Sequence, residues 1–138
     1  MLNDFICPHC EGHMMIAGHI IFAAVKKKDN KLGIILLDPR IGDYTSVLHH
    51  SFKIEEGEEV DFLCPMCHKS LAALDVDKRL VRIILVDQHS DQYEILFSGI
   101  AGKHCTYKIT SKSIEQMGKD SDEYIDYFKL CDKYKNLL

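Results

Sequence analysis

The sequence lacks several features that would mark a function at once. Its 138 residues contain no tryptophan and only 3 prolines, so neither a proline-rich linker nor a low-complexity arm is present. No phosphate-binding glycine loop, Gly-x-Ser-x-Gly elbow or His-Glu-x-x-His motif occurs. An enzymatic role is therefore left undetermined, and a noncatalytic role is the better fit to the sequence.

A basic excess is also missing. The formal net charge is −4, whereas nonspecific nucleic-acid binding depends on lysines and arginines that neutralise phosphates. The basic run 26–28 and the acidic run 55–59 are interpreted as solvated turn residues. The composition thus argues against nucleic acid as the partner.

Long apolar runs are absent as well. The most hydrophobic stretch, Met14 to Val25, is shorter than the roughly 20 residues that span a bilayer. It follows a cysteine pair and has no basic region before it, which is not typical of a secretory signal. We therefore expect a cytoplasmic protein without a membrane segment.

The chain does contain a repeated cysteine motif. Four of its 6 cysteines form two Cys-Pro-x-Cys units, at 7–10 and 64–67, and these units are the only internal repeat visible in the sequence. A Cys-x-x-Cys turn presents two sulfurs to one side of an ion, and structural zinc takes four ligands in a tetrahedron. Without a secretory signal, such pairs indicate metal ligands rather than disulfides. The predicted ligands of one structural zinc ion are Cys7, Cys10, Cys64 and Cys67.

The two units resemble the knuckles of zinc ribbons and rubredoxins, over about a dozen residues around the motifs. The glycine that often follows the second cysteine is replaced by Glu11 and His68. The resemblance implies a zinc ribbon that ties the N-terminal end to the middle of the chain, with rubredoxin-like iron as the alternative metal. The segment 7–10 also matches the active-site tetrapeptide of periplasmic disulfide oxidases, but the strand before it and the helix after it that such a site needs are not predicted.

Hydrophobic patterning predicts a mostly β structure. The predicted strands cover 14–25, 33–37, 47–54, 80–86, 93–97 and 106–109. We predict one α+β domain over residues 1–138, with a mainly antiparallel β-sheet, a zinc ribbon and one C-terminal helix.

The helix is predicted at about 121–136. Asp120 and Glu123 have the spacing of a capping box, although Asp rather than Ser or Thr stands at the cap. Tyr124, Phe128 and Cys131 then share one helical face, so this face is expected to pack on the sheet.

The remaining histidines and cysteines give weaker signals. His104 and Cys105 form the only other pair with nucleophile-and-base chemistry. Because neighbours on a strand face opposite ways, Cys105 is interpreted as a core thiol. The same alternation assigns His49 and His50 to opposite faces, which argues against a metal site that uses both.

The function predicted from these features is a noncatalytic binding or adaptor module. It would recognise a protein partner through its sheet or an exposed loop, away from the metal. Two alternatives stay open. A nucleic-acid-binding zinc ribbon would be favoured by a contiguous basic face, and a thiol enzyme using Cys105 requires an exposed thiol beside a pocket. The sequence leaves the oligomeric state open.

Overall fold

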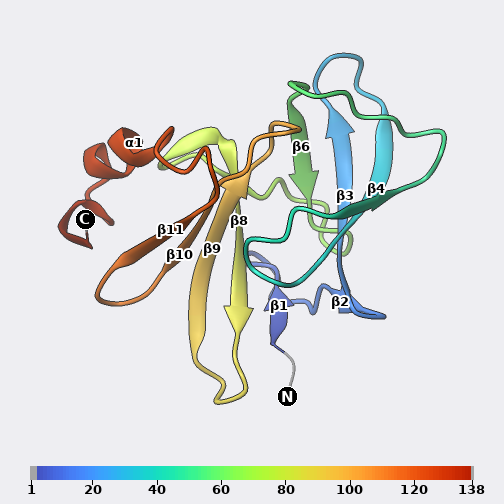
Figure 1. Cartoon of the computed structure of the whole chain (residues 1–138). Helices are drawn as coiled ribbons and strands as arrows, with labels where there is room; N and C mark the ends of the chain where they lie inside the picture. Colours follow the sequence, from blue (N-terminus) through green and yellow to red (C-terminus); the bar gives the residue numbers. More distant parts are fainter. Residues whose placement is uncertain (1–2, 138) are drawn as a thin grey trace.

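The computed structural model describes residues 3–137 and is built mainly from two antiparallel sheets (Figure 1). The five-stranded sheet contains β2 (Met15–Ile16), β3 (His19–Lys26), β4 (Leu32–Leu37), β5 (Ser46–Leu48) and β6 (Val60–Leu63). The six-stranded sheet contains β1 (Asp4–Ile6), β7 (Ala72–Ala73), β8 (Asp77–Val86), β9 (Gln92–Ser98), β10 (Thr106–Ile109) and β11 (Ile114–Met117). The prediction of a mainly antiparallel β structure is confirmed.

One core lies between the inner faces of the two sheets. Alternate residues of the long strands point into it, so β3 buries Phe22 while β8 buries Ile83. At its centre, Phe22, Phe62 and Phe97 pack edge to face, with ring centroids between 5.2 and 5.8 Å apart. Burial of these faces against each other is what holds the two sheets together.

Two of the predicted strands are wrong in extent. The apolar stretch 14–25 is divided by a tight turn, because Ala17 and Gly18 take φ values of 52° and 78°. The strand predicted over 47–54 ends at Leu48. Beyond it, Phe52 is folded into the space over Gly33, where an added Cβ would meet its ring at 2.3 Å. Filling that space buries the Phe52 side chain, as the predicted strand would also have done, but in a loop conformation.

The predicted C-terminal helix is also shorter than expected. The α-helix α1 covers only Ile125–Leu130, and a 3₁₀ turn, η1, follows at Lys135–Leu137. Cys131 is extended, with φ −90° and ψ 118°, which ends the helix. Asp120 does not act as a cap, because its carboxylate accepts a hydrogen bond from the His104 amide at 2.9 Å. The residues on the predicted face are nevertheless buried, as expected.

The structure contains an internal repeat that extends far beyond the two cysteine motifs. Strands β1–β5 of the first repeat (residues 4–48) correspond to β6–β10 of the second repeat (residues 61–108). The pairing registers match: Leu37 of β4 faces Ser46 of β5, and the corresponding Phe97 of β9 faces Thr106 of β10. In the sequence, only the two cysteine motifs mark this repeat.

Unusual backbone conformations recur at corresponding places in the two repeats. Glu11 and His68, directly after the knuckles, have φ values of 60° and 64°. Asn30 and Ser90 in the hairpin turns have φ values of 59° and 65°. Few non-glycine residues adopt this left-handed conformation. Its recurrence shows that the two repeats follow the same path. Because each repeat also supplies its first strand to the sheet of the other, a pseudo-two-fold axis relates them.

The two repeats are interlocked by exchange of their first strands. Phe5 of β1 pairs with Leu85 in the second repeat, and its counterpart Phe62 of β6 pairs with Ala24 in the first. Each sheet therefore contains one strand from the other repeat. As a result, the two knuckles that directly follow these strands are carried toward the same place.

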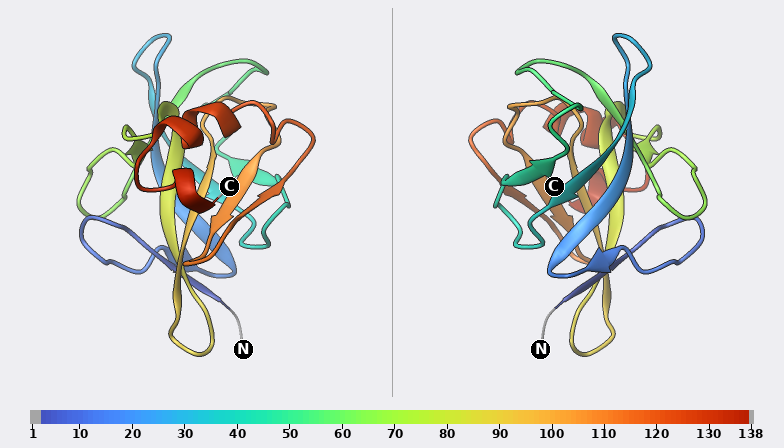
Figure 2. Two further views of the ribbon diagram at one scale, coloured as in Figure 1. Left: turned by 90° about the vertical axis from the view of Figure 1, so that its left-hand side faces the viewer. Right: turned by 90° about the vertical axis from the view of Figure 1, so that its right-hand side faces the viewer.

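The C-terminal segment covers the outer face of the six-stranded sheet, as the left-hand view of Figure 2 shows. Tyr124, Phe128 and Tyr134 are buried against Leu96 and Tyr107 in a second apolar cluster. Polar contacts hold the segment at its end: the Tyr134 hydroxyl receives a hydrogen bond from Arg82 at 2.8 Å and donates to Glu94 at 3.0 Å. Residues 121–137 therefore serve as a lid on one sheet only.

Alkaline pH is expected to destabilise this cluster. Burial raises the pKa of Tyr107 and Tyr124, and raises that of Tyr134 from the ordinary 10.0 to about 12. The folded state therefore favours the neutral phenols. Their contribution to stability is complete below pH 10.0 and is lost as the pH rises toward about 12, because unfolded tyrosines ionise first.

The measurement is denaturant unfolding between pH 8 and 12, followed by circular dichroism, with tyrosinate absorbance recorded in parallel. The free energy of unfolding should fall over that range, and the fall should be shallower in Tyr134→Phe. A free energy that stays constant to pH 12 would contradict this prediction.

Candidate metal centre

The exchanged strands bring the two knuckles together, and the four predicted cysteines form one cluster. Their sulfur atoms all lie within 4.8 Å of one another. Cys7 Sγ lies 3.8 Å from Cys67 Sγ, and the symmetry-related pair Cys10 and Cys64 lies at 3.7 Å. A tetrahedral ion with metal–sulfur bonds of about 2.3 Å requires sulfur–sulfur edges of about 3.8 Å. The cluster therefore has the size of a four-thiolate metal site.

Each knuckle is a tight turn that points backbone amides at its sulfurs. In the first, the His9 amide donates to Cys7 Sγ at 3.3 Å, and in the second the Met66 amide donates to Cys64 Sγ at 3.4 Å. The turns close through Glu11 N to Cys7 O and His68 N to Cys64 O, both 2.9 Å. Amide donors stabilise thiolates, which are the form that binds a metal.

The four thiols differ in their exposure and in their acidity. Cys7 and Cys64 are buried, Cys67 is half-buried and Cys10 is exposed. Burial raises the pKa of Cys7 to about 12 and also raises that of Cys64. The backbone amide of Lys69 lowers the pKa of Cys67. Access to the cluster is therefore from the side of Cys10.

His9 and His13, on either side of the first knuckle's end, have polar partners other than the sulfurs. His9 Nε2 lies 3.0 Å from the Ser70 carbonyl, so the first knuckle is joined to the chain after the second. His13 Nδ1 lies 2.6 Å from a carboxylate oxygen of Asp4. Within residues 3–137, the four cysteines are the only group of three or more Cys, His, Asp or Glu side chains placed to hold an ion.

The structure contradicts two hypotheses drawn from the sequence, one on His49 and His50 and one on Cys105 as a nucleophile. His49 and His50 do not occupy opposite faces, because β5 ends before them and their rings lie 4.1 Å apart. Cys105 is fully buried, and burial raises the pKa of its thiol to about 11. A thiol nucleophile must be accessible and ionised, so Cys105 does not meet the requirement of the thiol-enzyme alternative.

Two features escaped the sequence reasoning. The first is a cavity between the sheets, lined by segments distant in sequence, for which no local signal exists. The second is an exposed apolar surface on the five-stranded sheet. A signal for it was present, because 33–37 is a continuous apolar run, and strands of that kind are typically covered on both faces.

Comparisons with protein-family models, with curated proteins and with solved structures gave no match. In the part of the chain that the structure describes, no helix has the length and hydropathy to cross a membrane.

Proposed function

We propose that this chain is a noncatalytic protein-binding module in which Cys7, Cys10, Cys64 and Cys67 hold one structural zinc ion. The sulfur spacing of 3.7 and 3.8 Å supports a tetrahedral ion. Four protein thiolates leave no open position for water or substrate, which is the composition of structural rather than catalytic zinc sites. The ion would clamp the two repeats at the point where their exchanged strands end.

The observation that carries the binding role is the outer face of the five-stranded sheet. We define this outer face by Ile16, Ile21, Ile34, Leu36 and Val47. Ile21 pairs with Leu36, and Leu36 pairs with Val47, so an apolar row crosses three strands. Ile16, Ile34 and Val47 are 61%, 49% and 48% exposed. A contiguous apolar patch of this kind on a protein surface is typical of an interaction site.

The internal repeat indicates what covers this outer face. Leu96 and Tyr107, the counterparts of Leu36 and Val47, are fully buried by the C-terminal segment. Ile16 is 61% exposed whereas its counterpart Ala73 is buried. In the right-hand view of Figure 2, no helix of residues 3–137 lies in front of β3 and β4. The expected occupant is therefore an amphipathic helical segment of a partner protein, with aromatic or aliphatic residues along one side.

The nucleic-acid alternative gains no support from the charges. Lysines of the basic run 26–28 pair with glutamates of the acidic run 55–59, although Lys27, Lys28, Glu55 and Glu56 are exposed as predicted. Lys26 Nζ lies 3.3 Å from Glu58 Oε1, and Lys27 pairs with Glu59. Because these lysines are already neutralised by carboxylates, they do not form the contiguous basic face that phosphate binding requires.

Site-specific photocrosslinking tests the binding role. A photoreactive phenylalanine analogue replaces Val47 on the outer face, and the matched control places it at Leu130, an 83% exposed residue on α1. The experiment is done in cells of the source organism. We expect crosslinks from position 47 only, and the crosslinked peptides should come from one partner protein and belong to an amphipathic helix. Crosslinks to a second copy of this chain, crosslinks of equal pattern from both positions, or none from position 47 would each overturn the proposal.

A further inference from the structure

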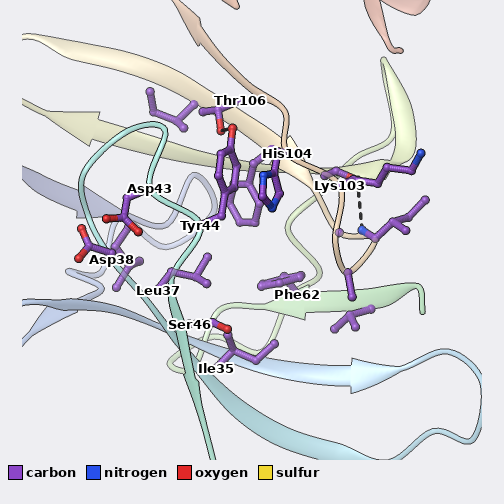
Figure 3. Close-up of a pocket in the computed structure, with 18 of the residues that line it drawn as sticks. Ile35, Leu37, Asp38, Asp43, Tyr44, Ser46, Phe62, Lys103, His104 and Thr106 are labelled. Atoms are coloured by element: carbon purple, nitrogen blue, oxygen red, sulfur yellow. Dashed lines mark hydrogen bonds between the residues drawn. The ribbon is translucent and has the colours of Figure 1, made fainter. Parts of the chain in front are cut away.

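A cavity of about 400 Å³ lies between the inner faces of the two sheets, under the loops 38–45 and 99–105 (Figure 3). Symmetry-related residues line it in pairs, among them Phe5 with Phe62 and Ile35 with Ile95. The cavity therefore straddles the pseudo-two-fold axis, and we name it the axial cavity. Exposed residues such as Gly42 and Ser46 also line it, so the cavity opens to solvent at its rim, as small-molecule sites usually do.

Aromatic side chains form one end of the axial cavity. Tyr44 and its counterpart His104 stack across the axis, with ring centroids 4.4 Å apart and planes within 6° (Figure 3). The Tyr44 hydroxyl is hydrogen-bonded to Thr106 Oγ1 at 3.0 Å. The amide of His104 donates to Asp120 at 2.9 Å. These contacts hold the end of the cavity in place without a ligand, which is typical of preformed small-molecule sites.

The charges around the cavity determine which ligands it accepts. The acidic residues Asp38, Asp43 and Glu56 are among those that line it. The guanidinium of Arg40 lies 2.9 Å from Asp38 and 3.0 Å from Asp43. The ammonium of the other lining cation, Lys103, is 3.4 Å from Glu123. Because both cations already pair with carboxylates, the lining has no excess of positive charge to attract an anionic ligand, and a neutral ligand is favoured.

We propose that the axial cavity binds a neutral, largely apolar small molecule. Aliphatic and phenyl side chains such as Leu37, Phe62 and Phe97 surround its body, and the Tyr44–His104 pair meets its end. A cavity of roughly 150 Å³ holds one benzene ring. In proportion, 400 Å³ accepts about sixteen non-hydrogen atoms. This size corresponds to two linked aromatic rings or a medium-length aliphatic chain.

The test uses N-phenyl-1-naphthylamine, a neutral two-part aromatic molecule whose fluorescence rises in apolar surroundings. We expect saturation at one equivalent per zinc-loaded chain. Its sulfonated relative, 1-anilinonaphthalene-8-sulfonate, should bind about tenfold or more weakly, because the lining has no excess of positive charge to attract it. Equal affinity for both molecules, or no saturable binding of the neutral one, would overturn the proposal.

Neighbouring positions on β5 give matched variants. Leu48→Trp fills the cavity from within and should weaken binding about tenfold or more, whereas Val47→Trp, on the opposite face of the same strand, should leave it unchanged. Ser46→Trp fills the rim of the cavity from an exposed position. It is therefore a second blocking variant, and it should lower the stability of the fold less than Leu48→Trp. Loss of binding in Val47→Trp alone would place the probe on the outer face and contradict the proposal.

The binding site can also be located in the wild-type protein, so that this result does not depend on whether the variants fold. In methyl-labelled wild-type protein, nuclear Overhauser contacts from the bound amine should reach Ile35 and Leu37, which line the cavity. Contacts to Ile34 and Val47 instead would locate the molecule on the outer face of the sheet and overturn the assignment.

Discussion

Substitution of Cys64 by serine is expected to abolish the native fold at room temperature. Structural zinc in a four-thiolate site contributes on the order of 10 kcal/mol to folding. A typical domain is stable by about 5–15 kcal/mol in total, so the loss of one ligand leaves little or nothing. Cys64 is buried and lies 3.7 Å from Cys10 Sγ, so serine would also leave a buried hydroxyl among thiolates. The same outcome is expected on treatment of the wild-type protein with a strong chelator.

The measurement combines metal analysis with thermal unfolding and native thiol titration. We expect one zinc per chain and no rapidly reacting thiol in the wild-type protein, because Cys105 and Cys131 are buried. Cys131→Ser is the matched control, since it changes a cysteine outside the cluster and should keep both the zinc and the fold. Less than half an equivalent of zinc, or rapid labelling of Cys7 and Cys10, would contradict the prediction. One equivalent of iron would favour the rubredoxin-like alternative.

The sequence predicted the cysteine cluster because a Cys-x-x-Cys turn fixes its two sulfurs locally. The hairpin of β8 and β9 could also be predicted from the sequence, because its apolar runs flank a short polar turn at 89–91. In these places the local chemistry and the tertiary structure require the same conformation, so a local pattern is enough to predict the structure.

The repeat could not be predicted because the two halves share a path rather than a sequence. Only the motif Asp-Phe-x-Cys-Pro-x-Cys is plainly common to them. Structurally corresponding pairs such as Tyr44 and His104 differ in residue type. A β-strand tolerates many side chains so long as one face stays apolar. The outer faces therefore differ, and residues 121–137 cover the face of one sheet while the apolar face of the other is exposed at Ile16, Ile34 and Val47.

The predicted strand at 47–54 and the helix at 121–136 failed for a shared reason. In both places a tertiary contact replaced the local pattern. Phe52 is held over Gly33, and Asp120 is bonded to the amide of His104. Neither contact has a sequence signal, because each joins segments that only the folded chain brings together.

Truncation of Phe128 is expected to produce the second largest loss of stability. Its side chain is fully buried, and its ring lies 4.8 Å from Tyr107 and 5.6 Å from Tyr134. Phe128→Ala should lower the free energy of unfolding by about 3–5 kcal/mol. For a chain of this length, the midpoint of thermal unfolding should fall by roughly 10–20 °C. Leu130→Ala is the matched control on the same helix, because Leu130 is 83% exposed and its loss should cost within about 0.5 kcal/mol.

The comparison of these two variants also tests how the two sheets differ. If residues 121–137 are a lid that the six-stranded sheet requires, Phe128→Ala should increase the exposure of Leu96 and Tyr107 to hydrogen exchange before global unfolding. The corresponding residues Leu36 and Val47 should be unaffected, because they do not belong to the apolar cluster that contains Phe128. Equal losses of stability in Phe128→Ala and Leu130→Ala would show that the segment does not protect the sheet. The analogy that assigns a helical partner to the outer face would then lose its basis, since it depends on the lid being a true structural cover.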